Sequence, residues 1–313
     1  MLFDNQLASD SSPQQKGGIF SKGLIKERKG EIVELETMIA ELFHRQSSRI
    51  LDFDLFSYIR YQLRRPKMFE ESLPQKRFGY IYPRWEVDSL PYELYRVLPD
   101  KVMAVMCPIH LKEFTPQDVE RALAPFDDYI KALVDRDVDI IVQGGVPLDL
   151  VQGVKKHDEF LERIAKKTGL PATSTIQTVT KATQHMGIKK VVFVNKWSPE
   201  MNKSMAMYFE REGISVLGAH CKSFKMEELL KLKGVDNTNL LYQLAREAFQ
   251  QYPDTDGIYL GGGSMISFPI VDPLEQEFGK PVILNVTSLS WTLCHMLDYW
   301  TPVLGKGRLL ASQ

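Results

Sequence analysis

The sequence predicts an α/β protein with two similar lobes, each a parallel sheet covered by helices. From about residue 77 onward, short runs of β-branched and aromatic residues alternate with longer amphipathic stretches. Such alternation is typical of a parallel sheet with helices on both faces. An internal repeat, and a glycine-rich loop in each copy of it, indicate that this α/β unit occurs twice.

The elements follow from the pattern in chain order. Strands are expected at Phe78–Tyr82, Val102–Met106, Asp139–Gln143, Val191–Asn195, Gly257–Leu260 and Pro281–Asn285, and more weakly at Pro171–Ser174 and Ser215–Ala219. Helices are expected at Pro116–Arg136, His157–Lys167, Ile176–His185, Glu200–Glu212 and Thr238–Gln251. Before these, apolar residues recur at helical spacing between Leu24 and Leu63, which predicts two amphipathic helices.

Two segments of the first half recur in the second. Gly79–Trp85 resembles Val191–Trp197, because each is a hydrophobic strand that runs into a basic residue and a tryptophan. Asp139–Gly145 resembles Asp256–Gly262, because each is a strand that ends in glycines. Ligands of open α/β sheets bind at the carboxyl ends of the strands. We therefore expect the two glycine loops to face each other across a pseudo-two-fold axis, with the site in the cleft between the lobes.

The chain is expected to have three parts. Residues 1–76 form a disordered start and a helical extension, residues 77–185 with 289–313 form the first α/β lobe, and residues 186–288 form the second. The apolar face of the extension must be buried on the α/β body or on a second subunit. We therefore expect a homo-oligomer, with the N-terminal helices as one route to it.

Composition and charge exclude several classes of protein. The 39 Lys and Arg residues nearly balance the 40 Asp and Glu residues, so the net charge of -1 does not favour nucleic acid as a partner. Three scattered cysteines form no disulfide framework and no ligand set has zinc-like spacing, so we expect a cytoplasmic protein without metal or other cofactor. No apolar run reaches the roughly 18 residues of a membrane span, so no membrane partner is expected.

The two glycine loops are Gly144–Pro147 and Gly261–Ser264. Glycine after a strand lets backbone N–H groups point at a bound carboxylate or phosphate. The alternative is that these glycines only make tight turns between a strand and a helix. Two copies at corresponding positions favour a site, and neither loop completes a dinucleotide or Walker motif, so no nucleotide is expected.

The segment from Pro253 through Gly263, with Gly279–Val282 after its helix, resembles the second active-site loop of the aspartate/glutamate racemase superfamily. The resemblance is closest to the arylmalonate decarboxylase and maleate cis–trans isomerase branches. Similar features of the first half are Tyr82-Pro83, Gly145 with Gly153, and Gly169-Leu170-Pro171. The resemblance spans residues 77–300 and implies two α/β lobes that hold a substrate carboxylate between them.

Racemases of this superfamily use one cysteine in each loop as proton donor and acceptor. The resemblance places these positions on Gly145 and Gly262, so racemisation of the two-cysteine type is excluded. It also implies that the indole N–H of Trp197 binds the substrate carboxylate, where the decarboxylase branch has a tyrosine. The candidate substrate-binding residues are Pro83, Arg84, Gly145, Val146, Trp197, Gly262, Gly263, Ser264 and Asn285.

His110 is the candidate catalytic residue, as proton donor. Histidine titrates near neutrality, and the resemblance places its loop beside the substrate pocket. A surface or hydrogen-bonded core histidine is the alternative. Arg84 and Lys196 follow corresponding strand ends and can add a cation or simply lie in solvent, with Arg84 preferred. Asp149 is either a base or a helix N-cap.

The expected function is that of a cofactor-independent lyase acting on a small organic acid, such as an aryl or dicarboxylic acid. Decarboxylation through an enediolate is favoured, because backbone N–H groups of the two glycine loops would stabilise its negative charge. The alternatives are an isomerase or hydro-lyase with relocated acid and base, and a carboxylate-binding protein without turnover.

Overall fold

The computed structural model describes residues 72–84, 86–87, 89–222, 228, 231, 234–261 and 266–313. Contacts between residues divide the chain into two units, Met1–Met68 and Phe69–Gln313. The predicted N-terminal helices and the polar start before them lie outside the described residues.

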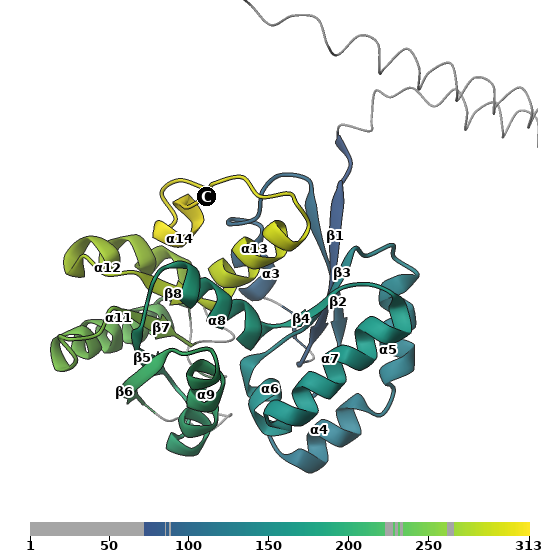
Figure 1. Ribbon diagram of the computed structural model, residues 1–313, viewed down its shortest axis with the longest axis horizontal. Coiled ribbons are helices and arrows are strands. Elements are labelled where there is room, and N and C mark those ends of the chain that lie inside the picture. Colours follow the sequence, from purple (N-terminus) through teal and green to yellow (C-terminus); the bar gives the residue numbers. More distant parts are fainter. Residues whose placement is uncertain are drawn as a thin grey trace, which may run out of the picture. The chain divides into compact units, whose positions relative to one another are not determined.

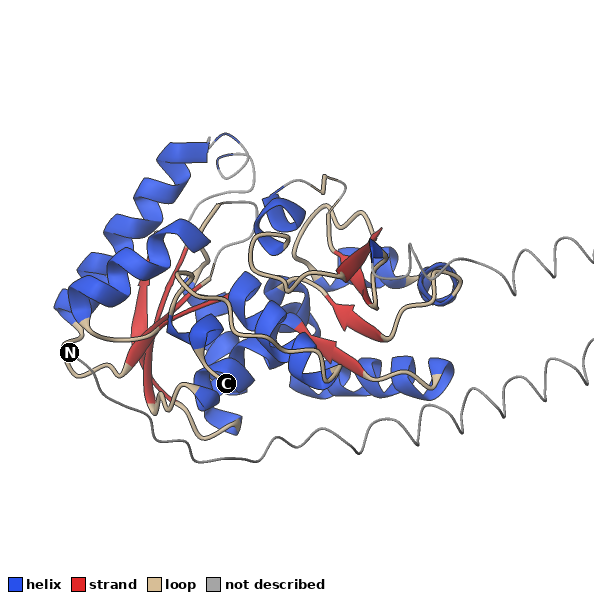
Figure 2. Ribbon diagram, turned by 90° about the horizontal axis from the view of Figure 1, so that it is seen from above, coloured by secondary structure: helices blue, strands red, loops and turns tan. Residues whose placement is uncertain are grey.

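Two four-stranded sheets with the same strand order form the second unit. The first, in the order β2-β1-β3-β4, consists of β1 (Lys76–Tyr82), β2 (Val102–Pro108), β3 (Ile140–Gln143) and β4 (Ala172–Ser174). The second, in the order β6-β5-β7-β8, consists of β5 (Lys190–Asn195), β6 (Ser215–Cys221), β7 (Gly257–Leu260) and β8 (Val282–Leu284). All these strand pairs are parallel. The structure thus confirms the predicted α/β fold with two parallel sheets, which Figure 2 shows as two groups of strands among helices.

Helices connect the strands and cover the sheets (Figure 1). Those of the first half are α3 (Ser89–Leu94), α4 (Pro116–Leu123), α5 (Phe126–Val134), α6 (Val146–Gln152), α7 (Val154–Thr168) and α8 (Thr175–His185). Those of the second half are α9 (Pro199–Arg211), α11 (Gly234–Gln251), the short 3-10 helix η2 (Phe268–Ile270), α12 (Val271–Phe278), α13 (Asn285–Met296) and α14 (Arg308–Ala311). Helices α8 and α13 pack side by side between the two sheets (Figure 1).

Most predicted elements differ from the observed ones only by one to four residues at an end, and two differences change the structure of the segment. The helix expected over Pro116–Arg136 is two helices, because Pro125 has no N–H and its ring cannot continue the first one. The last strand ends at Leu284 rather than Asn285, and Asn285 instead begins α13. The predicted boundaries between the two lobes stay a prediction, since α13 contacts α3 and α8 of the first half as well as β8.

A hydrophobic core that both sheets share joins the two halves. Phe78 and Val142 of the first sheet belong to the same buried cluster as Val194 and Leu260 of the second. The inner strands are buried on both faces, which explains why their sequences read as continuous apolar runs. The rigid core therefore holds the carboxyl ends of both sheets in place.

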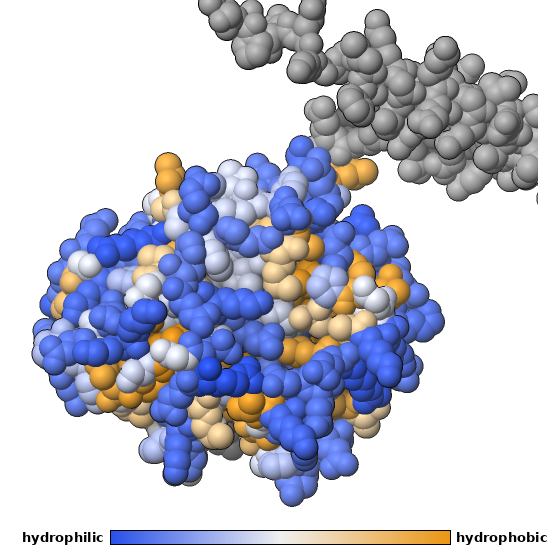
Figure 3. Space-filling view, in the orientation of Figure 1, coloured by the Kyte–Doolittle hydropathy of each residue, from blue (hydrophilic) through white to orange (hydrophobic). Residues whose placement is uncertain are grey.

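The face of the molecule in Figure 3 is mainly hydrophilic, with smaller hydrophobic patches. Among the described residues, no helix is both long and apolar enough to cross a membrane.

Candidate active site

The first glycine loop joins β3 to α6 and lies against Pro83, the residue that follows β1. Gly145 has a φ of +89°, and a Cβ atom there would lie 2.7 Å from the Pro83 Cγ. Both the backbone conformation and the close approach of Pro83 therefore require glycine at this position. The two predicted site residues Pro83 and Gly145 are thus in direct contact.

The N–H groups of this loop are mostly used within the protein. Gly144 donates to the carbonyl oxygen of Ile81 at 2.9 Å, and Gly145 donates to Thr175 Oγ1 at 3.0 Å. Pro147 has no N–H. This differs from the expected nest of donors, because the Gly145 amide already has an acceptor. Among the described residues nothing accepts from the N–H of Val146, which is the first residue of α6 and is fully buried.

A tyrosine hydroxyl meets the first residue of a helix in each half. The Tyr80 and Thr175 hydroxyls lie 3.1 Å apart at the start of α8, and Tyr259 donates to Asn285 Oδ1 at 2.6 Å at the start of α13. Burial raises the pKa of both tyrosines above its usual value, so both hydroxyls stay protonated. The sequence analysis proposed Asn285 as a site residue, which stays a prediction. It did not consider Tyr80, Thr175 or Tyr259, although Thr175 and Asn285 follow corresponding strands.

Asp149 lies on α6 and binds the start of α8. Its side chain is fully buried, and it accepts hydrogen bonds from the Ile176 N–H at 3.1 Å and from Gln143 Nε2. It therefore caps α8 and not its own helix α6. Burial raises its pKa well above the usual range and lowers the pKa of the nearby buried His157 to about 4. Both shifts favour the neutral form of the group, and both side chains are fully buried.

The second glycine loop makes the same kind of hydrogen bond to the neighbouring strand as the first loop does. Gly261 donates to the carbonyl oxygen of Val194 at 2.8 Å, as Gly144 does to Ile81, and a Cβ atom at Gly261 would lie 3.1 Å from the Trp197 ring. Trp197 and Val146 belong to one buried cluster, which links the two loops. Gly262, Gly263 and Ser264 lie outside the described residues.

His110 lies in the segment that follows the edge strand β2. The residues on either side of it bind the end of β1, since Ile109 donates to the Tyr82 carbonyl at 2.8 Å and Leu111 to the Pro83 carbonyl at 2.6 Å. The histidine backbone is therefore next to Pro83, with a φ of +60°. Arg84 forms a salt bridge of 2.9 Å with Glu86, so the predicted cation has a counter-ion.

The model of the arylmalonate decarboxylase family matches residues 80–310. The chain belongs to this family. It is 22% identical to arylmalonate decarboxylase of Bordetella bronchiseptica over 202 residues, which are 64% of this chain and 82% of the relative. It is 26% identical to maleate isomerase of Alcaligenes faecalis over 140 residues, which are 44% of this chain and 52% of the relative.

Solved structures of both kinds of enzyme share the fold. Unliganded arylmalonate decarboxylase has a TM-score of 0.67 at 21% identity, covering 76% of this chain and all of that one. The maleate isomerase Iso from Pseudomonas putida S16 has a TM-score of 0.64 at 20% identity, covering 76% and 98%. The superfamily inferred from the glycine loops is thus confirmed, and the two relatives are enzymes.

The described cysteines are poor candidates for the missing thiol chemistry of this arylmalonate decarboxylase family member. Burial raises the pKa of Cys107 and Cys221, and raises that of Cys294 to about 12. Because the thiolate is the reactive form, these thiols are held in the unreactive form at neutral pH.

A buried carboxylate joins the two halves near the second loop. Glu93 on α3 accepts hydrogen bonds from the backbone N–H groups of Ser267 and Phe268, the second at 2.7 Å, and from Ser267 Oγ at 3.2 Å. Burial raises its pKa to about 7. Glu93 thus ties α3 to the segment shortly after Gly261, and the sequence analysis missed it because Glu93 stands in no recognisable motif.

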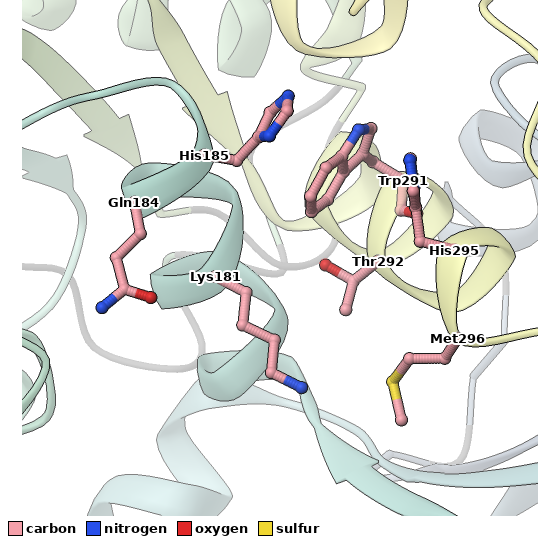
Figure 4. A pocket seen from close by; sticks show the side chains of 7 residues that line it. All are labelled: Lys181, Gln184, His185, Trp291, Thr292, His295 and Met296. Carbon is pink, nitrogen blue, oxygen red and sulfur yellow. The ribbon is translucent and has the colours of Figure 1, made fainter. Parts of the chain in front are cut away.

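A cavity of about 560 Å³ lies between α8 and α13 (Figure 4). It is lined by Lys181, Gln184, His185, Trp291, Thr292, His295 and Met296. None of the predicted site residues that the structure describes lines it.

Proposed function

We propose that this protein is a cofactor-independent enzyme that decarboxylates a small malonate-type diacid. Membership of the arylmalonate decarboxylase family over residues 80–310 is the observation that carries the proposal. In the reaction the bond to the departing carboxylate breaks and CO2 leaves. The electron pair stays on the remaining fragment as an enediolate, which then takes a proton at its α-carbon.

The residues of the first loop support the stabilisation of such an anion. The Val146 N–H at the start of α6 has no acceptor among the described residues, and the positive end of a helix favours negative charge. Pro83 lies against Gly145 and limits the space beside this amide. A preformed donor in a confined site favours charge that develops during the reaction.

Decarboxylation is favoured over isomerisation because residue 145 is a glycine and carries no thiol. A maleate cis–trans isomerase of Nocardia farcinica was solved with a covalently bound succinylcysteine intermediate. Such an intermediate needs a thiol, and in this chain glycine occupies the position that the superfamily resemblance gives to the first cysteine. Decarboxylation needs one proton donor and no covalent adduct, and we assign the donor role to His110.

The test is an assay of the full chain with phenylmalonate, methylmalonate and maleate, following CO2 release and fumarate formation. We expect CO2 from a malonate and no fumarate. His110→Asn should lower kcat by roughly 10²–10⁴-fold, as for loss of a general acid. His220→Asn is the matched control, because Gln251 and Glu247 hold both nitrogens of this ring at the other edge strand. Fumarate formation without CO2 release would overturn the proposal.

A binding protein without turnover is the second candidate. It is favoured by the Gly145 amide, which is engaged with Thr175 instead of pointing at a substrate. Saturable binding of phenylmalonate or maleate with no product from either would support this candidate against the enzyme.

A further inference from the structure

Lys196, which follows β5, is a buried cation without a counter-ion among the residues that the structure describes. It is 5% exposed and is the only buried lysine or arginine among the described residues. Its ammonium group donates to Asn237 Oδ1 at 2.8 Å, and within the described part of the chain no Asp or Glu forms a salt bridge with it. An ammonium group has three donors, so one neutral acceptor leaves it poorly satisfied.

A charge in this position is costly to keep. Removing an ammonium ion from water is unfavourable unless an anion compensates its charge. Burial lowers the pKa of Lys196 to about 8, so the group is still mostly charged at neutral pH. A protein that only needed to fill this space would be more stable with an apolar side chain of the same size. The buried charge therefore points to a role for Lys196 that needs a positive group.

The position of Lys196 identifies the place where an anion would bind. The next residue, Trp197, packs against Gly261 at the start of the second glycine loop. On the other side, the Lys196 partner Asn237 precedes Thr238, whose hydroxyl donates to the Ile266 carbonyl at 2.7 Å. The neighbours of Lys196 thus contact residues on both sides of that loop, at the carboxyl end of the second sheet. Ligands of parallel sheets bind at this end.

The first loop leaves a need for such a cation. Of its amides, only that of Val146 has no acceptor within the described residues, and Arg84 is already paired with Glu86. A diacid carries two negative charges, and one amide does not compensate them. A second positive group in the second half would complete the site.

We propose that Lys196 binds a carboxylate of the substrate as its counter-ion. This inference rests on the proposed function in taking a carboxylic diacid as substrate, and adds the residue that selects for the second carboxylate. Lys196 acts as a binding residue, and no proton transfer is assigned to it.

Calorimetric titration of the full chain with phenylmalonate tests the inference. Lys196→Met keeps the length of the side chain and removes the charge, and we expect it to raise the Kd at least tenfold. Lys196→Arg keeps the charge and should stay within a few-fold of the wild type. Lys203→Met, at an exposed position on α9, is the matched control and should bind like the wild type.

Thermal unfolding separates this role from a structural one. If Lys196 binds substrate, Lys196→Met should unfold at the same or a higher temperature than the wild type without ligand, because a desolvated charge is gone. If Lys196 only holds Asn237, the variant should unfold at a lower temperature and keep its affinity, which would overturn the inference.

The two proposals can fail separately. If phenylmalonate binding depends on Lys196 but no CO2 is released, the proposed decarboxylase activity is overturned and the proposed role of Lys196 as counter-ion is supported. CO2 release with an unchanged kcat/KM in Lys196→Met would overturn the counter-ion and leave the decarboxylase in place. Absence of phenylmalonate, methylmalonate and maleate binding to the wild type would overturn the counter-ion.

Discussion

The Gly145 amide donates a hydrogen bond of 3.0 Å to the Thr175 hydroxyl, which ties the first glycine loop to the start of α8. The same hydroxyl lies 3.1 Å from that of Tyr80 on β1. One threonine therefore joins three segments of the first sheet at its carboxyl end.

Thr175→Val should destabilise the protein by about 1–3 kcal/mol, because the substitution keeps the shape and removes the partner of the half-buried Gly145 amide and of the buried Tyr80 hydroxyl. Thr175→Ser keeps the hydroxyl and should cost less. Tyr80→Phe removes only one partner of the hydroxyl and should also cost less. Urea unfolding of the three variants measures the order, and equal stability of Thr175→Val and the wild type would contradict the role of this bond.

Gly145→Ala should destabilise more than Gly153→Ala. Both glycines have a positive φ, so both substitutions introduce backbone strain of about 1–2 kcal/mol. Only at Gly145 does the new Cβ also meet a neighbour, Pro83 Cγ at 2.7 Å, whereas nothing lies within 4 Å at Gly153. The difference in free energy of unfolding, about 1–3 kcal/mol, measures the Pro83 contact. Equal effects would mean that Pro83 moves away freely.

Asp149→Asn should be tolerated better than Asp149→Ala. Burial raises the pKa of Asp149 and thus favours its neutral form, and an asparagine carbonyl can still accept from Ile176. Gln143 Nε2 faces Asp149, and a turn of the Gln143 side-chain amide brings its Oε1, a buried oxygen without a hydrogen-bond partner, to the new amide donor. Alanine leaves the Ile176 and Gln143 donors unpaired, at a cost of about 1–3 kcal/mol each. Unfolding at pH 7 decides this, and a larger loss for asparagine would show that Asp149 is ionised.

Glu93 should make stability depend on pH. Its folded-state pKa of about 7 lies above the usual 4.5, so the folded protein holds this proton more tightly than the unfolded chain does. The resulting stabilisation is complete below pH 4.5 and is lost as the pH rises through 7, by about 3 kcal/mol in total.

Glu93→Gln carries no titratable proton at this position, so the substitution removes the pH-dependent stabilisation. As the pH rises from 5 to 8, the unfolding free energy of the wild type should fall relative to that of the variant. A difference that stays constant over this range would contradict the raised pKa.

The apolar periodicity and the internal repeat are properties of the sequence, and they predicted the fold. The apolar run Val191–Val194 identified a strand buried on both faces, because a strand inside a parallel sheet has no solvent face. The recurrence of Asp139–Gly145 as Asp256–Gly262 predicted the second sheet, whose strand order is that of the first. Pro125 separates two helices in the structure. The amphipathic pattern continues across this proline, and the pattern alone therefore predicts one helix.

The sequence by itself determined which elements form, how often the unit repeats and where the glycine loops follow the strands. Only the tertiary structure decided which polar groups are left for a ligand. The Gly145 amide finds its acceptor 30 residues away, and Glu93 meets Ser267 across 174 residues. Lys196 resembles any strand-end cation in the sequence. It becomes unusual only because packing buries it with no carboxylate partner in the described part of the chain. Hydrogen-bond partners and desolvation depend on which distant residues the packed sheets bring together, and apolar periodicity carries no record of those distances.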